Sequence, residues 1–313
     1  MPLDILIVAA RRNREIDGVI DGLRDHGLAV RRLATCQYPE CESITWTPEA
    51  NLGNIYGSPR VAWLCDFSGW SFEDRLTGLE REVAVSESTA FVEGSLLDLD
   101  CKWLNSPQAA RSASRKLYQL GVARRLGVAI PETCVSNSSS VIRDFCKSHA
   151  RVVAKTLSVG FVRYDGQQIK FYTRRVDETD DKVFDGLRFG PLIFQVEIEK
   201  TEEIRVTVVD DQAFAVRFSL SGIGSDEVDI RRHDYKSHRD AFSACHDRPD
   251  ILDASRKISR ALNLSYAGID WAVDVGGQAF FLECNPFGSF KWFEMCSGQD
   301  ITSAITQALV RRC

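Results

Sequence analysis

The chain of 313 residues contains no apolar run as long as the roughly 18 residues that a membrane-spanning helix needs. It also has no surplus of positive charge, because 39 lysines and arginines stand against 44 aspartates and glutamates. A formal net charge of −5 does not provide the general basic surface of nucleic-acid or anionic-membrane binders, so we expect neither partner. The first apolar segment lacks the order of a secretory signal, and we therefore expect a cytoplasmic protein.

Three common site motifs are also missing. The ten cysteines form no C-x-x-C pair and are expected to be free thiols that act as small hydrophobic side chains. The P-loop pattern G-x-x-x-x-G-K-[ST] is absent, and Arg11, Arg12 and Asn13 occupy the turn where a dinucleotide-binding strand would continue into G-x-G-x-x-G. The cluster of histidines and Cys245 between His233 and His246 matches no zinc spacing. These absences argue against P-loop, dinucleotide-binding and structural zinc proteins.

The first hundred residues predict an α/β unit. Asp4–Ala10 is apolar after its first residue, which is typical of a strand that is buried on both faces of a parallel sheet. Apolar residues then recur at helical spacing from Ile16 to Leu23 and stop before Gly27, and Leu28–Ala34 reads as a second strand. This β-α-β start predicts a small N-terminal domain over residues 1–105.

A new unit is expected to begin near residue 105. Ser106 and Pro107 form a helix start, with serine as the N-cap and proline at the first helical position, and the helix is expected to run to Gly127 with Leu117 on its apolar face. Strands dominate after this helix, which predicts an α+β body. The expected strands are 151–157, 161–164, 168–174, 191–198, 203–209, 213–219, 267–273 and 278–284, with helices at about 177–188, 250–262 and 299–311.

The strongest chemical signal is a hairpin that contains two carboxylates. Two glycines at 276 and 277 lie between apolar runs and predict a two-residue turn, which places Asp270 directly opposite Glu283 on one face of the sheet. Asn285 is two residues further along and shares that face. Facing carboxylates repel unless a cation lies between them, and oxygen ligands of this kind suit Mg²⁺. The apolar neighbours favour this interpretation over a solvated polar face.

Cationic residues provide the second signal. If a turn is centred on Asp211, Arg205 opposes Arg217, and both would address one anion such as a triphosphate; two solvated edge arginines are the alternative. Lys155 lies inside an apolar strand, which is costly without an anionic partner, while Lys116 lies on a helix. Together these residues predict a phosphate site without a P-loop.

Further short segments accompany these residues: Trp103–Pro107, Lys116–Leu120, Gly127–Thr133, Phe194–Lys200 running into Glu203–Thr207, Asp229–Arg232 and Leu282–Gly288. In this order and spacing the chain resembles the ATP-grasp enzymes, and within them the peptide-modifying ligases that make microviridin-type graspetides. The resemblance covers most of the chain. It implies that an ATP-grasp body follows the N-terminal domain, with the nucleotide held between two β-sheet subdomains, residues 106–191 and 192–313.

The resemblance also implies roles for individual residues, with ATP and Mg²⁺ as cofactors. Lys116 and Lys155 would contact phosphates, and Arg205 would face the transferred phosphoryl group, where the pairing argument also places Arg217. Arg231 would pair with the substrate carboxylate, and Asp229 would orient it or take a proton from the attacking nucleophile; a solvated run of charges is the alternative for this segment. The remaining nucleotide contacts would come from Gln195, Val196, Glu197, Ile198 and Lys200, and the Mg²⁺ ligands would be Asp270, Glu283 and Asn285.

These parts predict a carboxylate that attacks the γ-phosphoryl group of ATP, giving an acyl phosphate that an amine or hydroxyl captures. The first hypothesis is a macrocyclase that crosslinks side chains in a precursor peptide with leader and core, a family in which homodimers are common. The second is a ligase for a free amino acid or a protein C-terminus. The third is a non-catalytic nucleotide-binding protein, which the intact set of three expected Mg²⁺ ligands disfavours.

Overall fold

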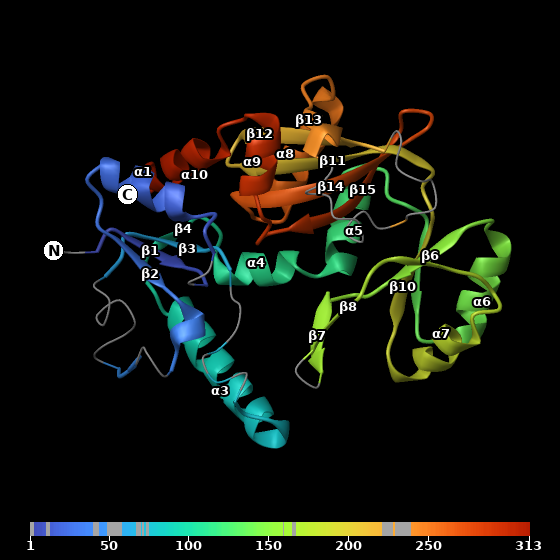
Figure 1. Cartoon of the computed structure of the whole chain (residues 1–313), viewed down its shortest axis with the longest axis horizontal. Coiled ribbons are helices and arrows are strands. Elements are labelled where there is room, and N and C mark those ends of the chain that lie inside the picture. Colours follow the sequence, from blue (N-terminus) through green and yellow to red (C-terminus); the bar gives the residue numbers. More distant parts are fainter. Residues whose placement is uncertain are drawn as a thin grey trace.

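The computed structural model describes residues 3–10, 13–39, 44–48, 58–66, 70, 72, 75–158, 160–164, 167–220, 228 and 239–313. Within these residues the strands form three sheets of four or five strands and one two-stranded hairpin. The three larger sheets follow one another along the chain (Figure 1). No helix in this part of the chain is both long and apolar enough to cross a membrane.

The first sheet is parallel and has the strand order β2-β1-β3-β4. Its strands are β1 (Ile5–Val8), β2 (Val30–Leu33), β3 (Val61–Leu64) and β4 (Lys102–Trp103). All four residues of β1 are buried, as their apolar sequence predicts. Helix α1 (Asp17–Asp25) packs against the C-terminal helix α10 (Ile301–Val310), so the chain's end returns to the N-terminal domain.

One long helix of the N-terminal domain has no counterpart among the sequence predictions. Helix α3 (Gly78–Leu97) extends away from the sheets (Figure 1), and its first two large apolar side chains, Leu79 and Val83, are exposed. Its fully buried apolar residues, Val92 and Leu96, both lie in the C-terminal half. This uneven burial gives the helix no single apolar stripe for a periodicity argument to detect.

The second sheet has the antiparallel order β5-β10-β6-β9. Its strands are β5 (Thr133–Ser136), β6 (Val152–Lys155), β9 (Arg174–Val176) and β10 (Leu192–Val196), with the hairpin β7 (Phe161–Tyr164) and β8 (Gln167–Lys170) inserted. Helices α6 (Ser139–Ser148) and α7 (Asp181–Gly186) share its apolar core. Because β10 pairs in this sheet, the proposed boundary between the central and C-terminal units moves from residue 192 to the segment after Val196.

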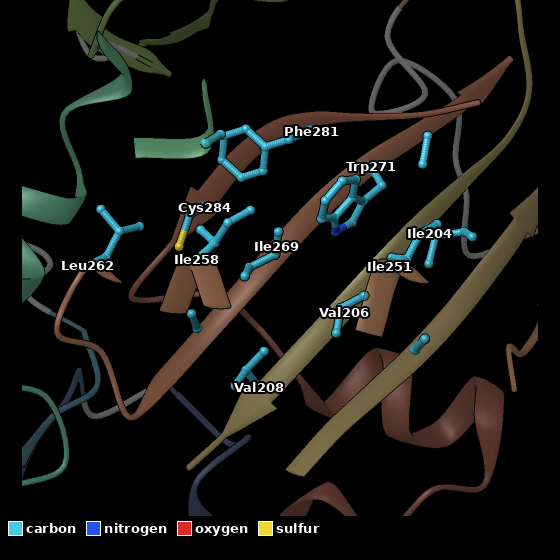
Figure 2. Packing of buried hydrophobic residues seen from close by; sticks show 14 of the residues in the cluster. Ile204, Val206, Val208, Ile251, Ile258, Leu262, Ile269, Trp271, Phe281 and Cys284 are labelled. Atoms are coloured by element: carbon cyan, nitrogen blue, oxygen red, sulfur yellow. The ribbon is translucent and has the colours of Figure 1, made fainter. Parts of the chain in front are cut away.

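The third sheet is antiparallel, in the order β13-β12-β11-β14-β15. Its strands are β11 (Lys200–Val209), β12 (Gln212–Ser219), β13 (Phe242–Ala244), β14 (Tyr266–Asp274) and β15 (Ala279–Asn285). One face packs on helix α8 (Pro249–Ala261) and α5 (Lys116–Arg125); Figure 2 shows Ile204, Val206, Ile269 and Trp271 in this core. Helix α9 (Lys291–Ser297) contacts β12 and β13 from the opposite face.

The helix that begins at Ser106 is broken into two. Helix α4 (Pro107–Ala113) starts as predicted, with the Ser106 hydroxyl accepting a hydrogen bond from the Ala109 N–H at 3.2 Å. It ends before Arg115, and α5 begins at Lys116 with a new direction. The prediction that Leu117 lies on the buried face is wrong, because Leu117 is 49% exposed. The break instead turns Leu120 and its neighbours toward the third sheet.

Candidate functional site

A cavity of about 350 Å³ lies between the second and third sheets. Val153 and Gln195 line it from the second sheet, Ala272 and Leu282 from the third, and Trp292 from α9. Most residues that the sequence predicted for nucleotide and phosphate contacts also line this cavity: Lys116, Lys155, Gln195, Val196, Glu197, Ile198, Lys200, Arg205, Asp270 and Glu283. The fold thus brings together positions that span more than half of the chain.

The segment that leaves the second sheet is held rigidly on its way to the third. Gln195 is 3% exposed, and its Nε2 donates to the Thr133 hydroxyl at 2.9 Å. The N–H of Glu197 donates to the carbonyl of Arg151 at 3.0 Å. The carboxylate of Glu197 accepts two hydrogen bonds of 2.7 Å from Arg175, a bidentate ion pair at the cavity wall. These contacts fix the backbone that would face a bound base.

Two lysines of the cavity bind neighbouring acceptors. The Nζ of Lys116 lies 3.3 Å from Oε2 of Glu283 and donates to the Thr156 carbonyl, also at 3.3 Å. The Nζ of Lys200 contacts the carboxylate of Glu203 and donates to the carbonyl of Val228 at 2.9 Å. Each ammonium group therefore faces the cavity in an anionic setting, and a bound polyphosphate could compete for it.

Asp270 and Glu283 are paired across β14 and β15, as the sequence predicts. The predicted turn is wrong, because the strands are joined by a three-residue loop, Val275–Gly277, closed between Asp274 and Gln278. Gly277 has φ +81°, the left-handed conformation that suits this loop type. The longer loop alone would shift the register of the whole hairpin by one residue.

A β-bulge at Leu282 restores the predicted pair. Trp271 pairs with Phe281, and the next pair is Asp270 with Glu283, so Leu282 is the extra residue of β15. Phe281 and Cys284 therefore both reach the apolar core, where Figure 2 shows Cys284 beside Ile258 and Ile269. Leu282 and Glu283 both line the cavity. The bulge aims Glu283 away from the core and toward Asp270.

Asn285 pairs with Gly268 at the end of the same hairpin. Its Oδ1 accepts a hydrogen bond from the Phe287 N–H at 2.9 Å, and its side chain is exposed rather than in the cavity wall. Its role as a ligand stays a prediction.

Arg205 is a largely enclosed cation of the cavity wall, with 12% of its side chain exposed. Its Nη1 lies 2.7 Å from both carboxylate oxygens of Asp270, and its Cζ lies 5.4 Å from the ring centre of Phe293. Burial disfavours its charged form, but the attraction of Asp270 outweighs burial and raises the pKa of Arg205. Arg205 therefore stays a cation at the wall that carries the carboxylates.

The prediction that Arg217 opposes Arg205 is wrong. Val209 pairs with Gln212, so the turn is centred between Asp210 and Asp211, and Arg205 lies opposite Val216 while Arg217 lies opposite Ile204. A shift of one residue moves a side chain to the other face of a sheet. There the guanidinium of Arg217 contacts the carboxylates of Glu202 and Asp247, the latter at 2.9 Å, away from the cavity.

Asp229 and Arg231 lie outside the described residues. Val228, the described residue before them, lines the cavity.

The donor set of the cavity fits Mg²⁺ bound together with a polyphosphate. In the part of the chain that the structure describes, no group of three or more histidine, cysteine, aspartate or glutamate side chains could hold a metal. Mg²⁺ bound with a nucleotide needs only one or two carboxylates, since water and phosphate oxygens supply the other ligands. Asp270 and Glu283, facing each other beside Lys116 and Arg205, provide this arrangement.

Sequence reasoning missed several residues of this site. Trp292 and Phe293 close the cavity from α9, a helix that had no predicted counterpart, and Arg175 holds Glu197 from a strand distant in sequence. Their positions follow from tertiary packing, and no local pattern marks them.

The similarity of this chain to known proteins lies in solved structures. No protein-family model matches the chain, and no curated protein matches it. A solved RiPP-associated ATP-grasp ligase of Chryseobacterium gregarium is 25% identical with a TM-score of 0.85, covering 99% of this chain and 97% of that chain. The chain has the ATP-grasp fold.

Two further solved structures are similar to this chain over nearly their full length. The macrocyclase MdnC of Microcystis aeruginosa MRC is 24% identical with a TM-score of 0.83, covering 99% of this chain and 100% of that chain. The macrocyclase MdnB from the same source is 26% identical with a TM-score of 0.75, covering 99% of both chains. The ATP-grasp body and the resemblance to peptide-modifying ligases, both expected from the sequence, are confirmed.

Proposed function

We propose that this protein is an ATP-dependent ligase that forms side-chain ester or amide crosslinks in a ribosomal precursor peptide. The observation that carries the proposal is the pair Asp270 and Glu283, which face each other in the cavity with Arg205 and Lys116 against their carboxylates. The solved ligase of Chryseobacterium gregarium contains ADP with a leader and core peptide, which supports a peptide as the substrate.

In this proposal each part of the cavity has one task. The backbone from Gln195 to Ile198 positions the base, and Lys116 and Lys155 bind the phosphates. Asp270 and Glu283, with Asn285 as a further candidate, hold Mg²⁺, which when bound offsets negative charge on the phosphate oxygens. Arg205 stabilises charge that develops on the transferring phosphoryl group, and Asp229 and Arg231 would orient the substrate carboxylate.

The reaction balances in two steps. A carboxylate oxygen of the peptide attacks the γ-phosphorus, the bond from that phosphorus to the β–γ bridging oxygen breaks, and ADP leaves. A lysine amine or a serine or threonine hydroxyl then attacks the carbonyl carbon of the acyl phosphate. Phosphate leaves with the electrons of the broken C–O bond, and the nucleophile releases its proton. The peptide has lost one water for each crosslink.

Incubation with ATP, Mg²⁺ and a candidate precursor, such as a short peptide encoded beside the gene, tests the proposal. Loss of water from the peptide, coupled to ADP release, is the expected result in mass spectrometry. A mass increase through a free amino acid would indicate the alternative ligase, and nucleotide binding without either product would indicate a non-catalytic protein. A cytoplasmic location fits the proposal, since ATP is available there and the nine described cysteines are free.

A further inference from the structure

The side chain of Gln119 joins helix α5 to strand β15. It lies one helical turn after Lys116, is 2% exposed, and is separated from its partner Cys284 by 165 residues. Its Nε2 donates to the Cys284 carbonyl at 2.6 Å and to the carbonyl of Ala113, and its Oε1 accepts from the Cys284 N–H at 2.9 Å. Both donor hydrogens of the amide are therefore used, and its oxygen is paired.

These bonds are made at the free edge of the sheet. Strand β15 pairs with β14 on one side only, and Gln119 takes the place of a neighbouring strand on the other side. The backbone N–H of Phe281 also faces this edge and donates to the Ala129 carbonyl at 2.9 Å. In a regular strand the backbone groups point to the same edge at every second residue. Phe281 and Cys284 are three apart, so both can face this edge only because the bulge lies between them.

The bulge decides which side chain faces the cavity. If the register of Trp271 and Phe281 continued without a bulge, Leu282 would lie opposite Asp270. Glu283 would lie opposite the fully buried Ile269, on the core face, and the backbone of Cys284 would turn toward β14. The backbone of Glu283 would then take the edge position of Cys284 beside Gln119. The amide therefore ties the strand edge to helix α5, while the burial of Cys284 in place of a charged Glu283 on the core face favours the bulged register.

We propose that Gln119 is a positioning residue that holds β15 against helix α5, where the strand presents Glu283 to the nucleotide cavity. The inference rests on the proposed function, because it concerns the carboxylate assigned there to Mg²⁺. The same helix carries Lys116, whose Nζ lies 3.3 Å from Oε2 of Glu283. One buried amide therefore fixes the position of the strand and, with it, the distance between Lys116 and the carboxylate of Glu283.

The test is the binding of ADP by calorimetry with and without Mg²⁺. The wild-type protein should bind ADP more tightly with Mg²⁺, and Gln119→Leu should lose about tenfold or more of this enhancement, the usual effect of removing a residue that orients a metal ligand. Its affinity for ADP without Mg²⁺ should change much less. The matched control is Ser259→Ala, which removes another buried hydrogen bond to a backbone carbonyl in the same unit, and should lower the melting temperature while keeping the enhancement.

A second variant covers the case in which Gln119→Leu does not fold. In Gln119→Glu the ionised carboxylate would face the carbonyl oxygens of Cys284 and Ala113 without a hydrogen to donate to them. The protonated form of the same side chain can accept from the Cys284 N–H and donate to the Cys284 carbonyl. The Mg²⁺ enhancement, relative to wild type at the same pH, should therefore recover as the pH falls. A folded Gln119→Leu with the wild-type enhancement, or Gln119→Glu with no recovery in acid, would overturn the inference alone. Wild-type protein that binds no nucleotide would overturn the proposed function as well.

Discussion

The guanidinium of Arg205 occupies the space in which a Cβ atom at Gly268 would lie. Gly288 faces the same guanidinium from the loop after β15, and a Cβ there would overlap it as well. Neither glycine has a positive φ, so the close approach of the Arg205 side chain, rather than an unusual backbone, accounts for both. The two glycines form a slot that holds the guanidinium against Asp270.

Gly268→Ala should displace Arg205 and lower ATP turnover by about 100-fold, because small misplacements of a group that acts on the transferring phosphoryl are costly. Release of ADP in the presence of peptide measures the effect. Gly94→Ala is the matched control, since among the described residues no atom beyond the local backbone of helix α3 lies within 4 Å of that Cβ. It should gain about 0.5–1 kcal/mol of stability and leave turnover unchanged. Equal turnover in the two variants would show that the slot has no function.

Glu283→Gln should leave the fold intact and abolish most ATP turnover. The substitution keeps the size of the side chain but removes the negative charge that faces Asp270 and contacts Lys116. Asn285→Ala should act in the same direction with a smaller effect, because a neutral ligand contributes less to cation binding. Phosphate release and the thermal unfolding midpoint are the two measurements. Near-normal phosphate release by a folded Glu283→Gln would contradict the assigned Mg²⁺ site.

Arg217→Gln should leave ATP turnover unchanged, in contrast to Arg205→Gln, which should abolish it. Arg217 lies on the face of the sheet away from the cavity and contacts Glu202 and Asp247. Loss of these partly exposed pairs should cost about 1 kcal/mol of unfolding free energy. Urea titration measures the cost. A fall in turnover without a change in stability would place Arg217 back in the reaction.

The two arginines and the two carboxylates show what the sequence can and cannot predict about a sheet. Both pairs were predicted by centring a turn, and both turns differ from the prediction. Between Arg205 and Arg217 the register is regular, so the shifted turn places the two side chains on opposite faces of the sheet. For Asp270 and Glu283 the bulge at Leu282 compensates for the loop, so the pair is right although the turn is not. Loop length and bulges are fixed by packing of the whole hairpin, which local sequence does not show.

The apolar strands and the capped helix start at Ser106 were predictable because burial and capping leave local patterns. Gln119 was not, since its role depends on Cys284, 165 residues away. Helix α9 also lacked a signal: none of its residues is fully buried, although Trp292 and Phe293 line the cavity. Residues that shape a site from a distance thus require the tertiary structure.

Asp210 should contribute stability at neutral pH that is lost in acid. It lies in the turn between β11 and β12 and accepts hydrogen bonds from Arg312 at 2.6 Å and Arg311 at 2.9 Å. Burial alone would raise its pKa, but these bonds outweigh burial and lower the pKa of Asp210 below its ordinary value of 3.8. A carboxylate with a lowered folded pKa stabilises the fold above the ordinary value, and this contribution disappears as the pH falls through the folded pKa.

Asp210→Asn should therefore cost about 1.5 kcal/mol at neutral pH, the lower end of the usual scale of hydrogen bonds to charged groups, because Asp210 is partly exposed. The difference from wild type should shrink below about pH 4. The backbone stays compatible, because Asp210 has φ +51° and asparagine tolerates this conformation. Denaturant titrations at several pH values measure the difference, and a cost independent of pH would contradict the role assigned to the arginines.

Arg175→Met should weaken nucleotide binding more than Glu197→Gln does, although both break the same ion pair. Removal of Arg175 deprives the carboxylate of Glu197, which is only 11% exposed, of two hydrogen bonds. It leaves that negative charge uncompensated at the wall of the cavity proposed to bind a polyphosphate. Glu197→Gln removes the charge instead. The double variant should regain most of the affinity lost by Arg175→Met, because no uncompensated carboxylate remains. Calorimetric ADP affinities of the four proteins form a double-mutant cycle, in which the proposal requires strong coupling. Losses that simply add would mean that Arg175 acts on the nucleotide independently of Glu197.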